Sequence, residues 1–350
     1  QRNELVDQLR GVVEAEHTYE RRARQLLDLG EAAIGRPRVA VKIGAPDSDR
    51  KHQWGDFHFA TSLVRSLRTH GFAGRVDLLP DWDAPDRQDA DVVIHLRGLS
   101  VYEPKPSAIN VMWLISHPDE VTPEECDRYD LVCVASKSLA EELRHVIETP
   151  VLYLPQATDA SRFGQAKRDA SLATEVLFVG NSRNQDRPVV RWAVENRLPL
   201  SVYGDGWEGR IPRRYWKGQY FPNERLPDLY ASAAIVLNDH WPDMRREGIV
   251  SNRVLDALAA GALVLSDPVA GLDDLVGDAV PTFSSPEELV QLVDKYLADP
   301  RSRSDLAEEG RRRVLADHSF DGRARRLTEL MVPLLGGRVR DLDGQVFRVS

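Results

Sequence analysis

The chain has 350 residues, enough for two domains of ordinary size, and 42% hydrophobic with 29% charged residues is typical of a folded protein in water. Its formal net charge of −9 argues against a general nucleic-acid-binding protein, because such proteins need a basic surface to replace the counterions of the phosphates. Two cysteines supply neither a disulfide framework nor four metal ligands, and without an apolar run of about 18 residues we expect a cytoplasmic protein that does not span a membrane.

The first 35 residues differ from the rest of the chain in periodicity and predict a separate helix. Apolar or aromatic residues recur every seven positions, at Leu5, Val12, Tyr19 and Leu26. Two interpretations stay open: the helix lies on its own domain, or it forms a coiled coil with a partner or a second copy of the chain. Because the sequence starts abruptly at Gln1, we also expect a fragment of a longer protein.

Residues 36–158 alternate short β-rich runs with helical segments and are expected to form the first domain. A helix is predicted over residues 54–70, where apolar side chains recur on one face. Most of the strand candidates are apolar throughout, so we expect them to be buried on both faces of a parallel sheet. They are RVAVKIG (38–44), RVDLLP (75–80), DVVIHL (91–96), INVMWLIS (109–116), DLVCVAS (130–136) and VLYLP (151–155).

A second series of the same kind covers residues 159–335 and predicts a second domain, followed by a tail at 336–350. The polar segment 155–174 is the expected join between the domains. Two doubly wound parallel sheets are therefore predicted, with ligands bound at the carboxyl ends of their strands in a cleft between them. The strand candidates are 175–181, 200–204, 233–238 and 262–267, and the helix candidates are 186–197, 285–298, 301–317 and 320–333.

The stretch SNRVLDALAAGALVLSD (251–267) places polar residues at the start of a predicted helix. Ser251 is expected to cap this helix, whose first-turn amide groups then attract an anion. Arg253 adds a positive charge, while Asn252 and Asp256 share one helical face. The set suits a nucleotide, with Arg253 on a phosphate and Asp256 accepting from ribose hydroxyl groups. The alternative is an ion pair between Arg253 and Asp256 on the surface, which would contribute little energy.

This stretch resembles the signature of GT-B glycosyltransferases of the family 4 and spore-maturation types, with Asp256 where the family usually has Glu. The resemblance extends to VLFVGNSRNQDR (176–187), VYGDGW (202–207), residues 216–238, SHPDEV (116–121) and YDLVCVASKSL (129–139). It implies an α/β fold of two Rossmann-like domains that face a cleft, here with an N-terminal helical extension.

In the family, the acid at the Asp256 position binds the donor ribose, and an acid eight residues earlier contacts the transferred sugar. Here that earlier position is Gly248, while Glu247 is adjacent and Asp243 is near. The sugar contact is therefore expected to have moved to a neighbour such as Glu247, or to be absent. The alternative for Glu247 is a solvated member of the charged run DMRRE.

The loop GNSRNQDR (180–187) follows a predicted strand and precedes a predicted helix. We expect Arg183 and Arg187, with the backbone amides of Gly180, Asn181 and Ser182, to bind the diphosphate that leaves during transfer. No metal is then needed. The alternative makes both arginines surface charges at a helix start, where the helix dipole disfavours cations. The sequence DWD (81–83) mimics a metal-binding Asp-x-Asp motif, but we interpret it as a loop.

Two further segments of the second domain are predicted to contact the nucleotide. Gly204, in VYGDGW, permits a close approach of the backbone to a ligand. The resemblance puts the base near the loop that contains Gln219, Tyr220 and Phe221, where an aromatic ring is expected to stack on it. The alternative for both rings is a place in the core.

In the first domain, SHP (116–118) and WGDFHF (54–59) follow predicted strands. The resemblance implies that His117 contacts the transferred sugar, whereas Asp56 and His58 line the acceptor side. The alternatives are a turn residue for His117 and a packed helix residue for His58. Asp56 is the candidate base if the reaction inverts the anomeric configuration, although the resemblance favours retention.

The resulting hypothesis is a metal-independent, hexosyltransferase-like enzyme of glycan biosynthesis. It would move a sugar from a nucleotide-diphosphate sugar to a glycan, a lipid-linked saccharide or another cell-surface precursor, without a cofactor. A lipid-linked acceptor implies peripheral contact with a membrane. The alternative is a catalytically silent GT-B-like module of a larger glycan-assembly protein, whose N-terminal helix binds a partner; the missing acid at Gly248 favours it.

Overall fold

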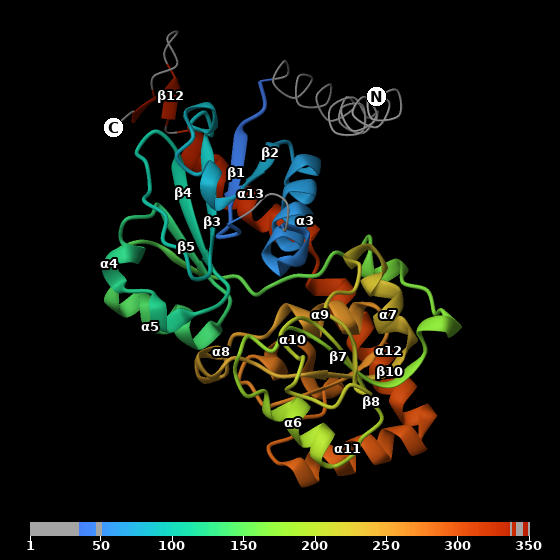
Figure 1. Cartoon of the computed structure of the whole chain (residues 1–350). Coiled ribbons are helices and arrows are strands. Elements are labelled where there is room, and N and C mark those ends of the chain that lie inside the picture. The colour runs from blue at the N-terminus through green and yellow to red at the C-terminus, as the bar shows by residue number, and fades with distance from the viewer. Residues whose placement is uncertain (1–34, 47–50, 337, 341–345, 349–350) are drawn as a thin grey trace, which may run out of the picture.

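The computed structural model describes residues 35–46, 51–336, 338–340 and 346–348. These residues form two domains, each built around its own parallel sheet (Figure 1). The predicted N-terminal helix, apart from residue 35, lies outside the described residues. No helix within the described part of the chain is long and apolar enough to cross a bilayer.

The first sheet has six parallel strands in the order β2-β1-β3-β4-β5-β6. Its strands are β1 (Arg38–Lys42), β2 (Ala73–Asp77), β3 (Val92–Arg97), β4 (Ile109–Leu114), β5 (Leu131–Val134) and β6 (Val151–Tyr153), and its helices are α3 (Gly55–Thr69), α4 (Pro123–Cys126) and α5 (Lys137–Val146). Alternate residues of β4 enter two different cores, Val111 and Trp113 on the α3 side and Met112 and Leu114 on the α5 side. Burial of both faces explains why this strand is apolar throughout.

The second sheet has five parallel strands in the order β11-β10-β7-β8-β9. Its strands are β7 (Thr174–Val179), β8 (Leu200–Tyr203), β9 (Trp216–Gly218), β10 (Ala233–Asn238) and β11 (Leu263–Ser266). The helices after β7 are α6 (Pro188–Glu195), α7 (Leu226–Ser232), α8 (Pro242–Glu247), α9 (Asn252–Ala259), α10 (Leu272–Val276), α11 (Pro286–Ala298) and α12 (Pro300–Asp317). Helices α6 and α11 contribute to the core on one face, and α7, α9 and α10 to the core on the other. The prediction of two parallel sheets with flanking helices is confirmed.

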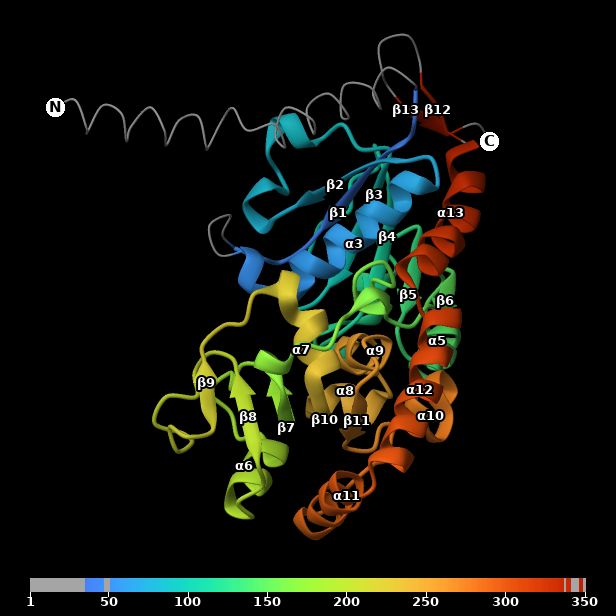
Figure 2. The same cartoon turned by 90° about the vertical axis from the view of Figure 1, so that its right-hand side faces the viewer.

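Helix α13 (Phe320–Gly336) follows the second domain in sequence but packs in the core of the first. Its buried side chains Phe320, Ala324, Leu327 and Met331 recur at helical spacing, and Phe320 contacts Phe59 of α3 edge to face. Figure 2 shows α13 alongside the first sheet, above α12. The sequence grouping of residues 159–335 therefore includes a helix that completes the first core. The predicted tail contains a two-stranded ladder of β12 (Arg338–Arg340) and β13 (Val346–Arg348).

The chain passes between the two domains twice, and the two crossings lie against each other. The amide of Thr158 donates to the carbonyl of His318 over 2.9 Å, and the amide of Phe320 donates to the carbonyl of Thr158 over 3.0 Å. Near the first crossing, Asp159 accepts from Ser62 and Arg65 of α3, at 2.8 Å each. The predicted join at 155–174 is thus an ordered connection that packs on both domains.

Candidate functional site

Three arginines meet near the carboxyl ends of β7 and β10, and we call Arg183, Arg187 and Arg253 the arginine cluster. Arg187 donates through both Nε and Nη2 to the carboxylate of Asp239, and Arg253 donates to Asn238 over 2.8 Å. Arg183 makes no ion pair with any residue that the structure describes; its guanidinium lies 4.2 Å from the ring centroid of Trp241. Asp239 therefore pairs with Arg187 and lies 4.0 Å from Arg253, while Arg183 has no ion-pair partner among the described residues.

The electrostatics of the cluster reflect this excess of positive charge. Desolvation of the guanidinium and the charges of Arg187 and Arg253 together lower the pKa of Arg183 to about 10, although part of the side chain is exposed to solvent. Burial and Arg187 likewise lower the pKa of Arg253. Because a guanidinium loses its proton more easily only where its charge is poorly compensated, the cluster favours binding of an anion. The side chain of Arg187 is largely buried in its pair with Asp239, so the surface-charge alternative does not describe it, whereas Arg183 is exposed and keeps that alternative.

Two loops approach each other closely beside the cluster, and glycines permit the approach. Gly204 has a φ of 146°, and a Cβ there would lie 2.1 Å from the carbonyl oxygen of Gly180. A Cβ on Gly180 would lie 2.7 Å from Nη2 of Arg253. Any side chain at either position would displace the loop or the arginine, so both glycines shape the site.

The amide groups expected to bind phosphate are partly used within the protein. The amide of Gly180 donates to Tyr203 over 2.8 Å, and that of Ser182 donates to Asp205 over 2.9 Å. The Ser182 hydroxyl donates to Gly206 over 2.7 Å, and Asn181 Oδ1 accepts from the Asp205 amide. The amides of Gly180 and Ser182 are therefore not available to a ligand, and the expectation for them is corrected: they fix the loop from which Arg183 and Arg187 project.

Asp256 on α9 lies at the contact between the second domain and the first crossing. It accepts from the hydroxyl of Thr158 over 2.7 Å and from Asn252 Nδ2 over 2.8 Å. Burial raises the pKa of Asp256 to about 7 despite the Thr158 hydrogen bond. Asn252 Oδ1 is buried and accepts no hydrogen bond from the described residues. An unpaired acceptor beside a carboxyl group is what a ligand with hydroxyl donors requires.

Two expectations for this helix are corrected. Ser251 holds the N-cap position, but its side chain caps no amide group of α9. The surface ion pair between Arg253 and Asp256 is not formed: Arg253 turns toward Asn238 and Asp256 toward Thr158. The partner of Asp256 comes from 98 residues away, so helical spacing alone had no means of revealing it.

The loop after β9 carries one exposed and one packed aromatic ring. Tyr220 is 44% exposed, and its hydroxyl donates to the carbonyl of His52 in the first domain over 3.4 Å. Phe221 packs on the core and meets Tyr203 edge to face, with ring centroids 5.1 Å apart. Phe221 therefore packs on the core, which was the alternative to stacking on a base, and Tyr220 is the ring that stays accessible.

His117 and Asp56, predicted from different loops, lie near the arginine cluster at the junction of the two domains. His117 has a φ of 52°, in the left-handed region, and its Nδ1 lies 3.5 Å from Oδ2 of Asp243. Burial raises the pKa of Asp56, while Arg183 and His117 oppose the increase. His58, in contrast, is bonded to the carbonyl of His52 at 2.8 Å. The carboxyl group of Asp56 therefore shares an electrostatic environment with groups from both domains.

The acidic side chain that meets His117 is Asp243, and Glu247 lies elsewhere on α8. Glu247 accepts from Arg246 over 2.8 Å, and its carbonyl accepts from the hydroxyl of Ser136 in the first domain. Asp243 is 7% exposed, and burial and a hydrogen bond with Asp119 raise its pKa. The sequence had put Asp243 in a charged run; the helix spacing within PDMRRE was the available signal.

No group of three or more side chains suited to a metal ion occurs among the residues that the structure describes. In the DWD segment, Asp81 accepts from the amide of Leu78 over 3.2 Å, and Asp83 accepts from Lys105 over 2.8 Å. Both aspartates therefore have local structural partners.

Comparison with known proteins assigns the fold and a family model. Residues 183–329 match the family described as glycosyl transferase-like. No curated protein matches the sequence. The chain superimposes on sucrose-phosphate synthase from Thermosynechococcus elongatus with a TM-score of 0.64 at 13% identity, over 86% of this chain and 100% of that one.

Two further structures with the same fold were determined with ligands. Anabaena HepE, solved with UDP and glucose, gives a TM-score of 0.58 at 12% identity, over 85% of this chain and 99% of that one. The T4 phage protein BGT, solved with UDP and Mn²⁺, gives the same TM-score and identity over 85% and 99% of the two chains. At such identities the likeness establishes the GT-B fold, while the chemistry has to be argued from the residues of this chain.

Proposed function

We propose that this chain, which has the GT-B fold and a second domain matching the glycosyl transferase-like family, is a glycosyltransferase that uses a nucleotide-diphosphate sugar. UDP-glucose is the first donor to test, since similar folds have been solved with UDP and glucose. The proposed acceptor is a glycan, a lipid-linked saccharide or another cell-surface precursor.

The observation that carries the proposal is the arginine cluster, in which Asp239 is paired with Arg187. Arg183 has a cation–π contact with Trp241 but no ion pair within the described part of the chain. A diphosphate supplies the missing negative charge. Charge on the diphosphate increases while the bond from the anomeric carbon to the phosphate oxygen breaks, so fixed guanidinium groups stabilise the transition state more than the bound donor.

Asp256 and Asn252 are proposed to bind the ribose. A ribose hydroxyl that donates to Asp256 finds an ionisable carboxyl, and a second hydroxyl finds the unpaired Oδ1 of Asn252. Asn252 and Asp256 lie on α9, one helical turn apart, and Arg253 belongs to the same helix. A ribose and its diphosphate therefore fit along one face of this helix, with Tyr220 as the accessible ring for the base.

The transferred sugar would then lie at the domain junction, near His117 and Asp56. In the retaining reaction that we favour, the acceptor hydroxyl forms the new bond to the anomeric carbon on the face from which the diphosphate leaves. Its proton passes to the departing phosphate oxygen. Such a reaction needs no strong protein base, and His117 contributes position and polar stabilisation.

The test is calorimetric titration with UDP, GDP and dTDP, followed by an assay for sugar release from the corresponding nucleotide sugars. We expect one nucleotide to bind, and its sugar conjugate to be hydrolysed slowly without acceptor. Arg183→Ala should reduce the binding, and Arg312→Ala, at a 66% exposed side chain on α12, is the matched control. Binding without release, even with acceptor extracts, would favour the silent module. Absence of all nucleotide binding would reject both forms of the proposal.

A further inference from the structure

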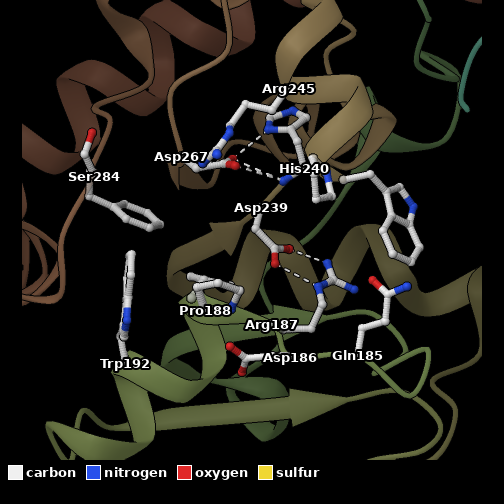
Figure 3. A pocket seen from close by; sticks show the side chains of 14 residues that line it. Gln185, Asp186, Arg187, Pro188, Trp192, Asp239, His240, Arg245, Asp267 and Ser284 are labelled. Atoms are coloured by element: carbon white, nitrogen blue, oxygen red, sulfur yellow. Dashed lines mark hydrogen bonds and ion pairs between the residues drawn. The ribbon is translucent and has the colours of Figure 1, made fainter. Parts of the chain in front are cut away.

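A cavity of about 310 Å³ lies in the second domain, next to the arginine cluster (Figure 3). It opens at the carboxyl ends of β10 and β11, between α6 and α8. Arg187 lines it, but Arg183, Arg253 and Asp256 do not. The cavity is therefore separate from the proposed ribose site and shares one wall, the Arg187–Asp239 pair, with the proposed diphosphate site.

Aromatic side chains form one part of the cavity wall. Trp192 of α6 and Phe283, from the segment before α11, lie edge to face with ring centroids 6.4 Å apart. Trp241 lines the cavity from another element. Its ring also lies 5.8 Å from the ring of His117 and below the guanidinium of Arg183. Trp241 thus connects this cavity to the domain junction.

The polar part of the wall combines fixed and unpaired groups. Asp239 is held by Arg187, and Asp267 by His240, whose Nδ1 lies 2.6 Å from Oδ1 of the carboxylate. Figure 3 shows both pairs beside the open space, with Arg245 above and Trp192 below. The side chain of Arg245 is exposed and makes no hydrogen bond or ion pair with the described residues. Charged side chains of both signs therefore line the cavity, namely the carboxylates of Asp186, Asp239 and Asp267 and the guanidinium groups of Arg187 and Arg245.

We propose that this cavity binds one neutral sugar ring of a saccharide, distinct from the donor. The C–H face of a pyranose packs on aromatic rings, while its hydroxyls donate to carboxylates and accept from guanidinium groups. The volume lies at the lower end of the range for small-molecule sites, which suits one ring. The mixed charge favours an uncharged polyol over an anion or a cation. The role of the cavity as an acceptor subsite rests on the proposed function, whereas the binding of a sugar ring in the cavity does not.

The test uses saturation-transfer NMR with the methyl glycosides of glucose, galactose, mannose and N-acetylglucosamine, in the presence of saturating UDP. Concentrations up to about 20 mM are needed, because a single ring binds weakly. We expect at least one glycoside to bind saturably and UDP to leave this binding in place. UDP binding is measured by calorimetry on the same sample, so that failure of the donor site and failure of the cavity give different results.

Two variants locate the binding. Ser284→Trp, at an exposed position of the cavity wall, should fill the space and abolish glycoside binding. Arg245→Ala should weaken it at least fivefold, whereas Arg312→Ala, at an exposed position of α12, should not. Nucleotide affinity should stay unchanged in Ser284→Trp, which also reports that the domain is folded. The proposal is overturned if no glycoside binds, if UDP displaces the glycoside, or if both cavity variants bind it like wild type.

Discussion

His117 and Asp243 lie on opposite sides of the domain junction, with the imidazole Nδ1 3.5 Å from the carboxylate Oδ2. His117 ends the loop after β4 of the first sheet, and Asp243 starts α8 of the second domain. Asp243 also shares a hydrogen bond with Asp119 of the first domain. The imidazole of one domain therefore lies within ion-pair distance of a carboxyl group of the other, and we expect the proposed site to be complete only when the domains are in contact.

His117→Ala is expected to lower turnover roughly a hundredfold, because a positioned polar group is lost from the transition state. Nucleotide affinity should change little, since the arginine cluster is intact. Asp243→Asn keeps the shape of the side chain and should lower turnover about tenfold with a smaller change in KM, as expected of a positioning residue. Steady-state kinetics of donor hydrolysis provide the measurement, with the exposed His145→Ala as control. Wild-type turnover in both variants would remove His117 from the site.

Arg183→Ala and Arg253→Ala should each weaken nucleotide-sugar binding by ten- to a hundredfold. This corresponds to about 1.5–3 kcal/mol for a hydrogen bond to a charged group. Arg183→Ala is the cleaner variant, because Arg253→Ala also leaves Asn238 Oδ1 without its donor. Melting temperatures of the Arg183→Ala protein should stay within a few degrees of wild type. Unchanged affinity in both variants would show that the cluster does not bind the nucleotide.

Binding of UDP-glucose is expected to strengthen as the pH rises from 6 to 8. The pKa of Asp256 is about 7, and a ribose hydroxyl donates better to the ionised carboxylate. The phosphates of UDP-glucose do not titrate in this range, so the protein group dominates. The gain should reach about tenfold at most and vanish in Asp256→Asn. Calorimetry at several pH values, corrected for buffer ionisation, measures it; a flat profile in wild type would contradict the assignment.

The carboxyl group of Asp256 also affects the stability of the fold, but with the opposite pH dependence: its neutral form is the one that stabilises the folded state. Folding raises the pKa of Asp256 from 3.8 to about 7, so the folded state favours the neutral carboxyl. Its contribution is full below about pH 4 and is lost as the pH rises to about 7. Relative to Asp256→Asn, the free energy of unfolding of the wild type should therefore decrease over this window and level off above it. Urea denaturation of the two proteins at matched pH values tests the sign.

Activity is expected to persist in excess EDTA, because in the proposed mechanism the arginine cluster neutralises the leaving diphosphate without a metal. Donor hydrolysis is compared with and without EDTA and after addition of Mg²⁺ or Mn²⁺. The comparison is sharpened by the T4 phage protein BGT, whose structure was solved with Mn²⁺. A complete loss that either metal restores would require a cation on the diphosphate and reject this mechanism.

Asp56→Asn should reduce transfer less than His117→Ala, because retention requires no protein base. Partial burial raises the pKa of Asp56, while Arg183 and His117 favour its charged form. The asparagine variant therefore also tests the contribution of this charge. NMR of the product gives the anomeric configuration. If the variant is inactive and the wild-type product has the inverted configuration, Asp56 is the base of an inverting reaction.

Strand positions followed from sequence because burial on both faces leaves long apolar runs. β9 was missed, since Trp216–Gly218 has only three residues and none is buried. The location of α13 could not be predicted from hydrophobic periodicity either. Its apolar face predicts that the helix is buried but does not identify the sheet on which it packs. In both cases the missing information is a tertiary contact, which a local pattern does not contain.

The residues of the candidate site were also predicted only in part. Charge and loop position were enough to bring Arg183, Arg187 and Arg253 forward. Their partners, Asn238 at the end of β10 and Asp239 directly after it, were not predicted. Likewise, Asp243 gains its importance only from His117, across 126 positions of sequence and a domain boundary.

The pairing of Thr158 with residues 318–320 limits how the two domains can move. Two neighbouring covalent connections allow one body to swing about them, but they resist translation of one body along the other. Thr158 also donates to Asp256, so the pivot itself bears on the carboxyl group proposed to bind the ribose. A ligand that takes over this carboxyl group would compete with the hydroxyl of Thr158, so donor binding and the hinge between the domains share one side chain.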